Sequence, residues 1–287
     1  MRIFQINCFC TNIEDSGNPA AVVVDCDALS PTEKQSIAKK LNFPVTTFVL
    51  NMNNSIPLLE YYYPESQMPL CLHGTIAAAH WLYHQGVFVN SDQLTCNRRY
   101  NEQCLSPLII KRTDIGHFLV EVFVDKVLQL DFNLIKLART FLQVPKDSQH
   151  IFDSELLFEI ASVGSPKFFI PVKTRKYLDQ LKPDLAAIKQ WSIDNQISGI
   201  YVYAKDNILK NTFYARNFNP KTGCPEDAAT GVAAGALSCG LERSLTVFQG
   251  ENLGRPSKLE ISYVGNGISW VGGLCVSGNE LTFPYKI

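Results

Sequence analysis

Apolar residues in this chain gather in short runs of strand length, and two longer segments are apolar on nearly every face. These segments are CLHGTIAAAHWLYHQG (71–86) and DAATGVAAGALSCGLE (227–242). A helix without a polar face is buried on all sides. The small alanine and glycine residues of both segments let neighbouring strands pack closely. The pattern therefore predicts two buried central helices, each surrounded by β-strands.

The two segments belong to an internal repeat. Residues 61–82 match residues 217–238 at an offset of 156, and two prolines with the same spacing precede the alanine-rich run in both copies. Upstream, the Gly-Asn-Pro of 17–19 resembles the Gly-Ser-Pro of 164–166, and each is a turn that leads into an apolar strand. Self-similarity of this kind indicates that one structural unit occurs twice in the chain.

Further elements follow each of these turns at similar distances. The sequence SPTE at 30–33 predicts an N-cap, a proline at the first helical position and a capping-box glutamate, and the helix is expected to end near Leu41. In the second copy, Pro183 precedes a comparable helix, DLAAIKQW. Strands are expected at 46–50 and at 200–203, where β-branched and aromatic residues gather.

These elements predict an α+β fold with two pseudosymmetric lobes, each a mostly antiparallel β-barrel wrapped around a central helix. The expected lobes are residues 1–115 and residues 116–287, and the last strands are candidates to pack back on the first lobe. A linker is expected within 112–155, where the sequence becomes more charged and more helical in pattern. A chain of 287 residues is long enough for two such cores.

Composition excludes several classes of function. With 26 basic and 27 acidic residues the net charge is −1, so no overall field attracts nucleic acid. No apolar stretch has the length of a signal peptide core or of a membrane span.

The nine cysteines form no C-x-x-C pair and no metal-ligand spacing with the histidines, so we expect no bound metal. We expect the thiols to be reduced and buried, in a cytoplasmic protein.

The starts of the two central helices are the best candidates for chemistry. Their free backbone N–H groups and positive dipole ends favour carboxylates or phosphates. At the offset of 156, Cys71 falls on Asp227, and two proton carriers that face each other are typical of acid/base isomerases. The alternative interpretation is that Asp227 only caps its helix and that Cys71 is a buried thiol.

His73 lies on the first turn of the first central helix, where the helix dipole disfavours a charged imidazole. A neutral ring there is able to donate or accept a proton. The alternative is a histidine that is packed in the interior with its hydrogen bonds satisfied.

These motifs also resemble a known family. The run Gly17-Asn18-Pro19-Ala20-Ala21-Val22, the helix start His73-Gly74-Thr75 and, above all, the pattern Arg216-x-Phe218-x-Pro220-x-x-Gly223-x-x-Glu226-Asp227-x-x-Thr230-Gly231 resemble the PhzF-like proteins of phenazine biosynthesis, which have the diaminopimelate epimerase fold. The resemblance covers essentially the whole chain, and the second-half motif is specific.

The resemblance implies two lobes with a site in the cleft between them, no cofactor, and a proton moved on a small carboxylate substrate, often by a homodimer. PhzF-like proteins rely on a glutamate just before a T-x-F-V strand, together with the residues that match His73 and Asp227. We therefore expect Asp227, His73 and Cys71 to be catalytic. Substrate binding is expected from a second set: Gly17, Asn18, Gly74, Thr75, Thr230 and Gly231.

The sequence departs from the family pattern in its first half. Val45 stands where the family has the glutamate, and valine cannot carry a proton. The helix start is Cys71-Leu72-His73-Gly74-Thr75, where the family has C-G-H-A-T, so that Leu72 replaces a glycine. Three further family residues are replaced, namely an aspartate by Asn7, an arginine by Glu60 and a glutamate by Gln67.

Three hypotheses follow. The chain is an isomerase whose proton transfer has been reassigned to Asp227, His73 and Cys71, or it is a catalytically impaired relative that binds a small ligand or regulates, or it is a structural protein with a filled cleft. The intact pattern from Arg216 to Gly231 favours the isomerase. Loss of one general acid or base typically lowers the rate by about 10² to 10⁴, so Val45 is as compatible with a weak enzyme as with none.

Overall fold

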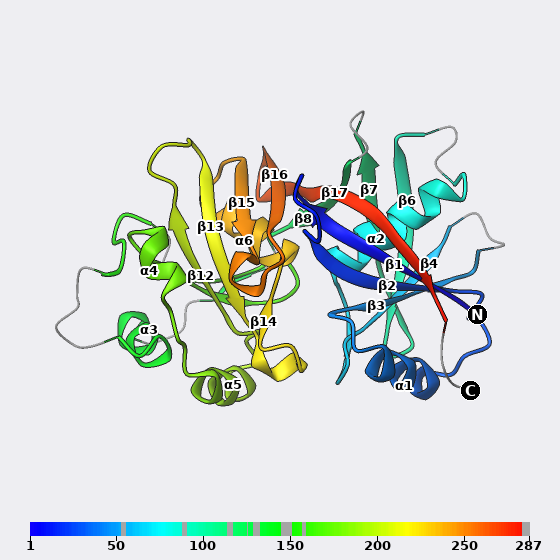
Figure 1. The fold of residues 1–287 in the computed structure, drawn as a ribbon, viewed down its shortest axis with the longest axis horizontal. Helices are drawn as coiled ribbons and strands as arrows, with labels where there is room; N and C mark the ends of the chain where they lie inside the picture. Colours follow the sequence, from blue (N-terminus) through cyan, green and yellow to red (C-terminus); the bar gives the residue numbers. More distant parts are fainter. Residues whose placement is uncertain are drawn as a thin grey trace. The chain divides into compact units, whose positions relative to one another are not determined.

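The chain has a mixed α+β fold with many strands and few helices (Figure 1). The computed structural model describes residues 1–52, 56–87, 91–113, 117–124, 126–128, 133–144, 151–156 and 159–282. The chain divides into two compact units, Met1–Glu121 with Gly272–Ile287, and Val122–Val271. Much of the expected linker at 112–155 lies outside the described residues.

The first unit consists of strands around one buried helix, with a second helix outside them. Its helices are α1 (Pro31–Leu41) and α2 (Leu72–His84). Its strands are β1 (Arg2–Cys10), β2 (Asn18–Val24), β3 (Thr46–Leu50), β4 (Leu58–Tyr62), β5 (Gln67–Met68), β6 (Gln93–Tyr100), β7 (Gln103–Arg112), most of β8 (His117–Phe123) and the later part of β17 (Ile268–Leu281).

The second unit has a similar set of elements. Its helices are α3 (Leu134–Phe141), α4 (Arg175–Asp179), α5 (Leu185–Asp194) and α6 (Gly231–Gly240), with 3-10 turns at Pro220–Thr222 and Glu251–Leu253. Its strands are β9 (Lys126–Leu128), β10 (Ile160–Ser162), β11 (Lys167–Pro171), β12 (Ile200–Lys205), β13 (Thr212–Phe218), β14 (Glu226–Asp227), β15 (Leu245–Gln249), β16 (Ser257–Gly265) and the start of β17.

Strand pairing repeats between the two units. In the first, β2 runs parallel to β3 across α1, β3 pairs antiparallel with β4, and β4 runs parallel to β6 across α2. In the second, β11 runs parallel to β12 across α5, β12 pairs antiparallel with β13, and β13 runs parallel to β15 across α6. The short helix α4, between β11 and α5, has no counterpart between β2 and α1.

The predicted start of the first exterior helix is confirmed. Glu33 N donates to Ser30 Oγ, and the Glu33 carboxylate accepts from Ser30 N at 2.8 Å, so the capping box is complete. Pro31 occupies the first helical position, where its missing N–H leaves no hydrogen bond unmade. Asn42 ends the helix in the left-handed conformation.

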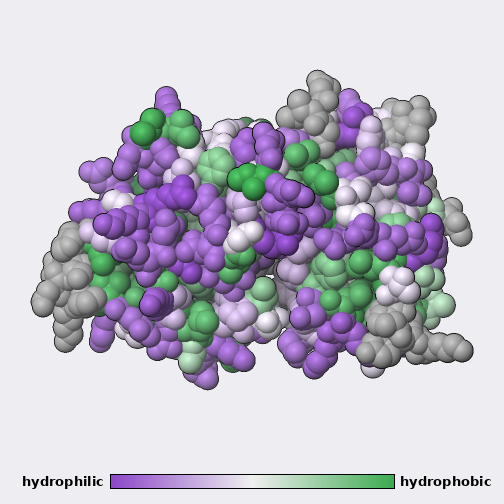
Figure 2. Space-filling model, viewed as in Figure 1, coloured by the Kyte–Doolittle hydropathy of each residue, from purple (hydrophilic) through white to green (hydrophobic). Residues whose placement is uncertain are grey.

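The two central helices are buried, as their apolar sequences predict. Every residue from Leu72 to Leu82 of α2 is buried, and so are most residues of α6. Small residues allow close approach, because a Cβ on Gly235 would lie 2.9 Å from Cγ2 of Val271 and 3.1 Å from Cγ2 of Val122. The visible face of the molecule is mostly hydrophilic (Figure 2). No helix in the described part of the chain is long and apolar enough to cross a membrane.

Replacing Gly199 with alanine is expected to lower the free energy of unfolding by about 2–4 kcal/mol. Gly199 has φ +84°, and a Cβ there would overlap the backbone oxygen of Phe218. Gly254 has φ +67° but no atom within 4 Å of its Cβ position, so Gly254→Ala is a matched control that should cost only about 1–2 kcal/mol. Urea unfolding measures both variants, and equal losses would contradict the overlap.

Candidate active site

His73 is held at the start of α2 by the first residue of β2. Its Nε2 lies 2.8 Å from the backbone oxygen of Asn18, and the side chain is buried. Because a carbonyl oxygen only accepts, this contact places the ring proton on Nε2. The segment Gly17-Asn18-Pro19 and the start of α2 therefore meet. Gly17 has φ +81°, and a Cβ there would lie 2.7 Å from Cys10 Sγ.

Val45 lies against the same turn of α2. A Cβ on Gly74 would be 3.2 Å from Cγ2 of Val45 and 3.1 Å from Cδ1 of Tyr61, and it would overlap Oγ1 of Thr47. Val45 is fully buried, and its oxygen accepts from Ala21 N at 3.0 Å. An apolar side chain therefore packs against the first turn of α2 at Gly74.

Cys71 and Thr75 shape the first turn of α2. The Cys71 thiol is the N-cap and accepts from Gly74 N at 3.4 Å. The Thr75 hydroxyl donates to the Cys71 oxygen at 2.8 Å and lies 2.7 Å from the Tyr61 hydroxyl. The Thr75 hydroxyl therefore takes part in internal hydrogen bonds that fix the helix start.

In the second unit, a hydrogen-bond network holds Asp227 just before α6. Asp227 lies on β14 and pairs with Asn217 of β13. Thr230, the N-cap of α6, donates from Oγ1 to Asp227 Oδ2 at 2.8 Å. Gln249 donates from Nε2 to the Asp227 backbone oxygen at 2.6 Å and to Thr230 Oγ1 at 3.1 Å, and Tyr201 donates to Gln249 Oε1 at 3.2 Å. Thr230 thus holds the carboxylate directly, and Gln249 and Tyr201 hold Thr230 and the Asp227 backbone in place.

The prediction that Cys71 and Asp227 occupy equivalent positions is wrong. Strand pairing places Met68 opposite Tyr61 and Asp227 opposite Asn217, so Met68 is the counterpart of Asp227. The reason is loop length. The segment 219–225 between β13 and β14 contains a 3-10 turn and is three residues longer than 63–66 between β4 and β5, so the offset changes from 156 to 159. The counterpart of Cys71 is therefore Thr230, since each is the N-cap of its central helix.

Sequence reasoning missed Lys167, the first residue of β11. Its side chain is 2% exposed, and Nζ donates to the backbone oxygen of Ser198. Burial lowers the pKa of Lys167 from 10.5 to about 7, and the nearby Asp227 carboxylate opposes this shift only in part. A lysine in the apolar run GSPKFFIP was the available signal. The structure thus adds a buried amine near Asp227.

The nine cysteines are free thiols. Burial raises the pKa of Cys8, and it raises the pKa of Cys96 to about 12. Cys104 is exposed, so the expectation that every cysteine except Cys71 packs in the interior is wrong at this position, which lies at the edge of a hairpin. Among the described residues, no group of three or more His, Cys, Asp or Glu side chains is arranged to hold a metal ion.

The chain belongs to the phenazine biosynthesis-like protein family, whose PhzC-PhzF model matches residues 7–271. It is 27% identical to an uncharacterized isomerase of Deinococcus radiodurans over 96% of this chain and 92% of that protein. It is 27% identical to the trans-2,3-dihydro-3-hydroxyanthranilate isomerase of Pseudomonas chlororaphis, over 93% of this chain and 92% of that enzyme. The PhzF family protein of Bacillus anthracis has the same fold, with a TM-score of 0.80, 22% identity and 98% coverage of each chain.

Proposed function

We propose that this protein is a cofactor-independent isomerase or epimerase that moves a proton on a small carboxylate-containing metabolite, with Asp227, His73 and Cys71 as the catalytic residues. The family and the isomerase names of its relatives support an isomerase-like activity. The observation that carries the proposal is the fixed Asp227 carboxylate, held by Thr230 at the start of a buried helix.

The proposed chemistry is one proton removed and one returned. A base takes the proton from an acidic C–H of the substrate, the electron pair stays on the substrate as a delocalised carbanion, and a second group protonates a carbon. Asp227 suits either step because a carboxylate accepts a proton and a carboxylic acid donates one. The ring of His73 donates from Nε2 to Asn18, which leaves Nδ1 as its basic nitrogen.

Substrate binding is proposed for the backbone around both helix starts, at Gly17, Asn18, Gly74, Thr75, Thr230 and Gly231. The N-terminal turns of α2 and α6 present N–H groups and positive dipole ends, which favour a carboxylate. We also propose that the protein is a cytoplasmic homodimer.

The strands of each unit are proposed to form a barrel around the central helix. In the first unit the pairings run from β1 through β2, β3, β4, β6, β7 and β8 to β17, which pairs with β1. A Cβ on Gly272 would overlap the backbone oxygen of Phe118, which supports close packing of β17 against β8.

Val45 favours a second candidate function, a catalytically impaired relative that binds a small ligand or regulates. Solvent isotope exchange distinguishes the two functions. An isomerase incorporates deuterium from D₂O at the acidic carbon of its substrate, whereas a binding protein binds the same compound without incorporation.

Replacing Val45 with glutamate is expected to raise the isomerisation rate, by up to about 10²-fold, because a carboxylate at this position would lie against Gly74 in the first turn of α2, the turn that carries His73. The rate is measured on trans-2,3-dihydro-3-hydroxyanthranilate, the compound in the name of a relative. Val45→Gln is the matched control, since it has the same length and no ionisable proton. Equal rates for the two variants would contradict the expected role of position 45.

A further inference from the structure

The first unit contains a cavity on the face of its sheet that is turned away from α2. On β4, Tyr61 points toward α2 and contacts Thr75, whereas Glu60 contacts Lys34 of α1. Successive side chains of a strand point to opposite faces, so Glu60 and Tyr62 face the α1 side. The cavity there has a volume of about 460 Å³, which is within the range of small-ligand sites. It is lined by Leu29, Pro31, Lys34, Glu60, Tyr62, Gln67, Arg99, Asn101 and Glu102.

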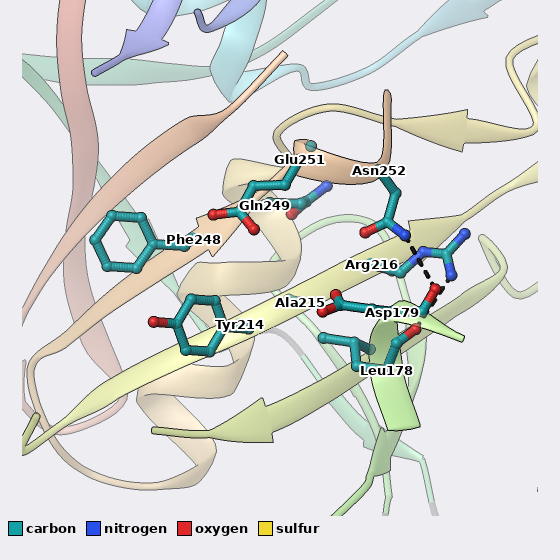
Figure 3. Close-up of a pocket in the computed structure, with 10 residues that line it drawn as sticks. Leu178, Asp179, Tyr214, Ala215, Arg216, Phe248, Gln249, Glu251 and Asn252 are labelled. Atoms are coloured by element: carbon teal, nitrogen blue, oxygen red, sulfur yellow. Dashed lines mark hydrogen bonds between the residues drawn. The ribbon is translucent and has the colours of Figure 1, made fainter. Parts of the chain in front are cut away.

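The second unit has a pocket at the equivalent place, but that pocket is almost filled. The strand registers make Arg216 the counterpart of Glu60 and Gln249 the counterpart of Arg98. Counting on along the chain from these positions, Gly250 corresponds to Arg99 and Asn252 to Asn101. The pocket beside these residues has a volume of only about 10 Å³ (Figure 3).

The helix α4 fills this place in the second unit. Arg216 donates from Nη1 to the backbone oxygen of Leu178 at 3.1 Å and to that of Leu181 at 3.0 Å, while Glu226 pairs with its other edge at 2.8 Å. Asn252 donates to the backbone oxygen of Asp179 at 3.1 Å (Figure 3). The segment around α4 that fills the pocket thus presents backbone carbonyl oxygens to the guanidinium of Arg216 and to the side-chain amide of Asn252. In the first unit, residues 25–30 form no helix between β2 and α1.

Buried donors remain available in the cavity of the first unit. Lys34 is 2% exposed and carries three N–H donors, and in the described part of the chain Glu60 Oε2, at 3.0 Å, is its only hydrogen-bond acceptor. Glu60 also accepts from Arg99 and from the Tyr62 hydroxyl, so both of its oxygens are occupied. Lys34 and Arg99 therefore share the one buried carboxylate of Glu60, and the other carboxylate of the lining, Glu102, is exposed at the rim.

We infer that this cavity is a binding site for a small free amino acid in its zwitterionic form. The ligand carboxylate binds the Lys34 ammonium and the edge of the Arg99 guanidinium that is turned away from Glu60. The ligand ammonium faces the carboxylate of Glu102 at the rim, and its side chain packs against Leu29 and Pro31. This inference is independent of the proposed isomerase activity, because none of the residues proposed for catalysis lines the cavity.

Calorimetric titration of the full-length protein with a panel of protein amino acids, with L-leucine as the reference probe, tests the inference. Binding of at least one of them with a Kd of about 1 mM or below is expected. L-leucinamide and N-acetyl-L-leucine, each of which lacks one of the two charges, are expected to bind at least about tenfold more weakly than L-leucine. Absence of binding by the whole panel, or equal binding of L-leucine and both analogues, would overturn the inference.

Two variants at the rim of the cavity test where the amino acid binds. Arg99→Met and Glu102→Gln are each expected to weaken binding about tenfold or more, because each removes one partner of a ligand charge. Arg2→Met, which removes an exposed arginine paired with Asp25 outside the cavity, is the matched control and should bind like the unmodified protein. Amino-acid binding should also slow hydrogen exchange in peptides that cover 29–36 and 99–102. Unchanged binding by both rim variants, or no protection in these peptides, would place the ligand elsewhere and refute the site.

Discussion

Replacing Asp227 with asparagine is expected to lower turnover by about 10² to 10⁴-fold while leaving the fold intact. The amide oxygen of asparagine still accepts the hydrogen bond from Thr230, so the start of α6 keeps its geometry, but the amide cannot carry a proton. The rate is measured on trans-2,3-dihydro-3-hydroxyanthranilate, and substrate binding is measured separately. The expected change lies in kcat, with a small effect on binding.

The matched control for this variant is Asp179→Asn, an aspartate on α4 whose side chain is 43% exposed. This control should retain the full rate. If Asp227→Asn were as active as Asp179→Asn, Asp227 would not be the proton carrier.

Replacing Lys167 with methionine is expected to stabilise the protein at and below neutral pH. The pKa of Lys167 falls from 10.5 in the unfolded chain to about 7 in the folded protein. At a pH where the amine is protonated, this shift lowers the free energy of unfolding by roughly 5 kcal/mol. Loss of the hydrogen bond to Ser198 offsets about 1–2 kcal/mol of the gain. The net gain at pH about 6 is therefore about 3 kcal/mol.

The sign of the pH dependence follows from proton binding. Between pH 7 and 10.5 the unfolded chain binds the Lys167 proton and the folded chain does not, so the free energy of unfolding rises with pH in this window. Lys167→Met removes this contribution, so its advantage shrinks as the pH increases. Urea unfolding between pH about 7 and 10.5 measures how this stability advantage changes, and replacement of the exposed Lys173 with methionine is the control. Parallel pH profiles for the unmodified protein and Lys167→Met would contradict the shifted pKa.

Sequence patterns predicted much of the secondary structure because they depend on local chemistry. The all-round apolar segment at 71–86 became α2, the capping box at Ser30 and Glu33 set the start of α1, and the run at 46–50 became β3. These features are fixed by neighbouring residues and by the need to bury apolar surface.

The arrangement of the site was less predictable because it depends on contacts between distant segments. The offset of 156 failed between Pro220 and Asp227, since a longer loop changes the register without leaving a periodic signal. The apolar run around Lys167 pointed to a buried lysine, but nothing in the sequence indicated that its amine would lie near Asp227. The cavity beside Lys34 is lined by residues that lie far apart in the sequence, between Leu29 and Glu102, so no local pattern predicts it.

The central claim, that this protein moves a proton on a small carboxylate, is tested most directly by incubating it with trans-2,3-dihydro-3-hydroxyanthranilate in D₂O and following the ligand by proton NMR and mass spectrometry. The account predicts that one deuterium enters the carbon skeleton as the compound isomerises, and that Asp227→Asn suppresses this incorporation. Binding of the compound with no deuterium incorporated on carbon and no isomerised product would contradict it and favour a ligand-binding role.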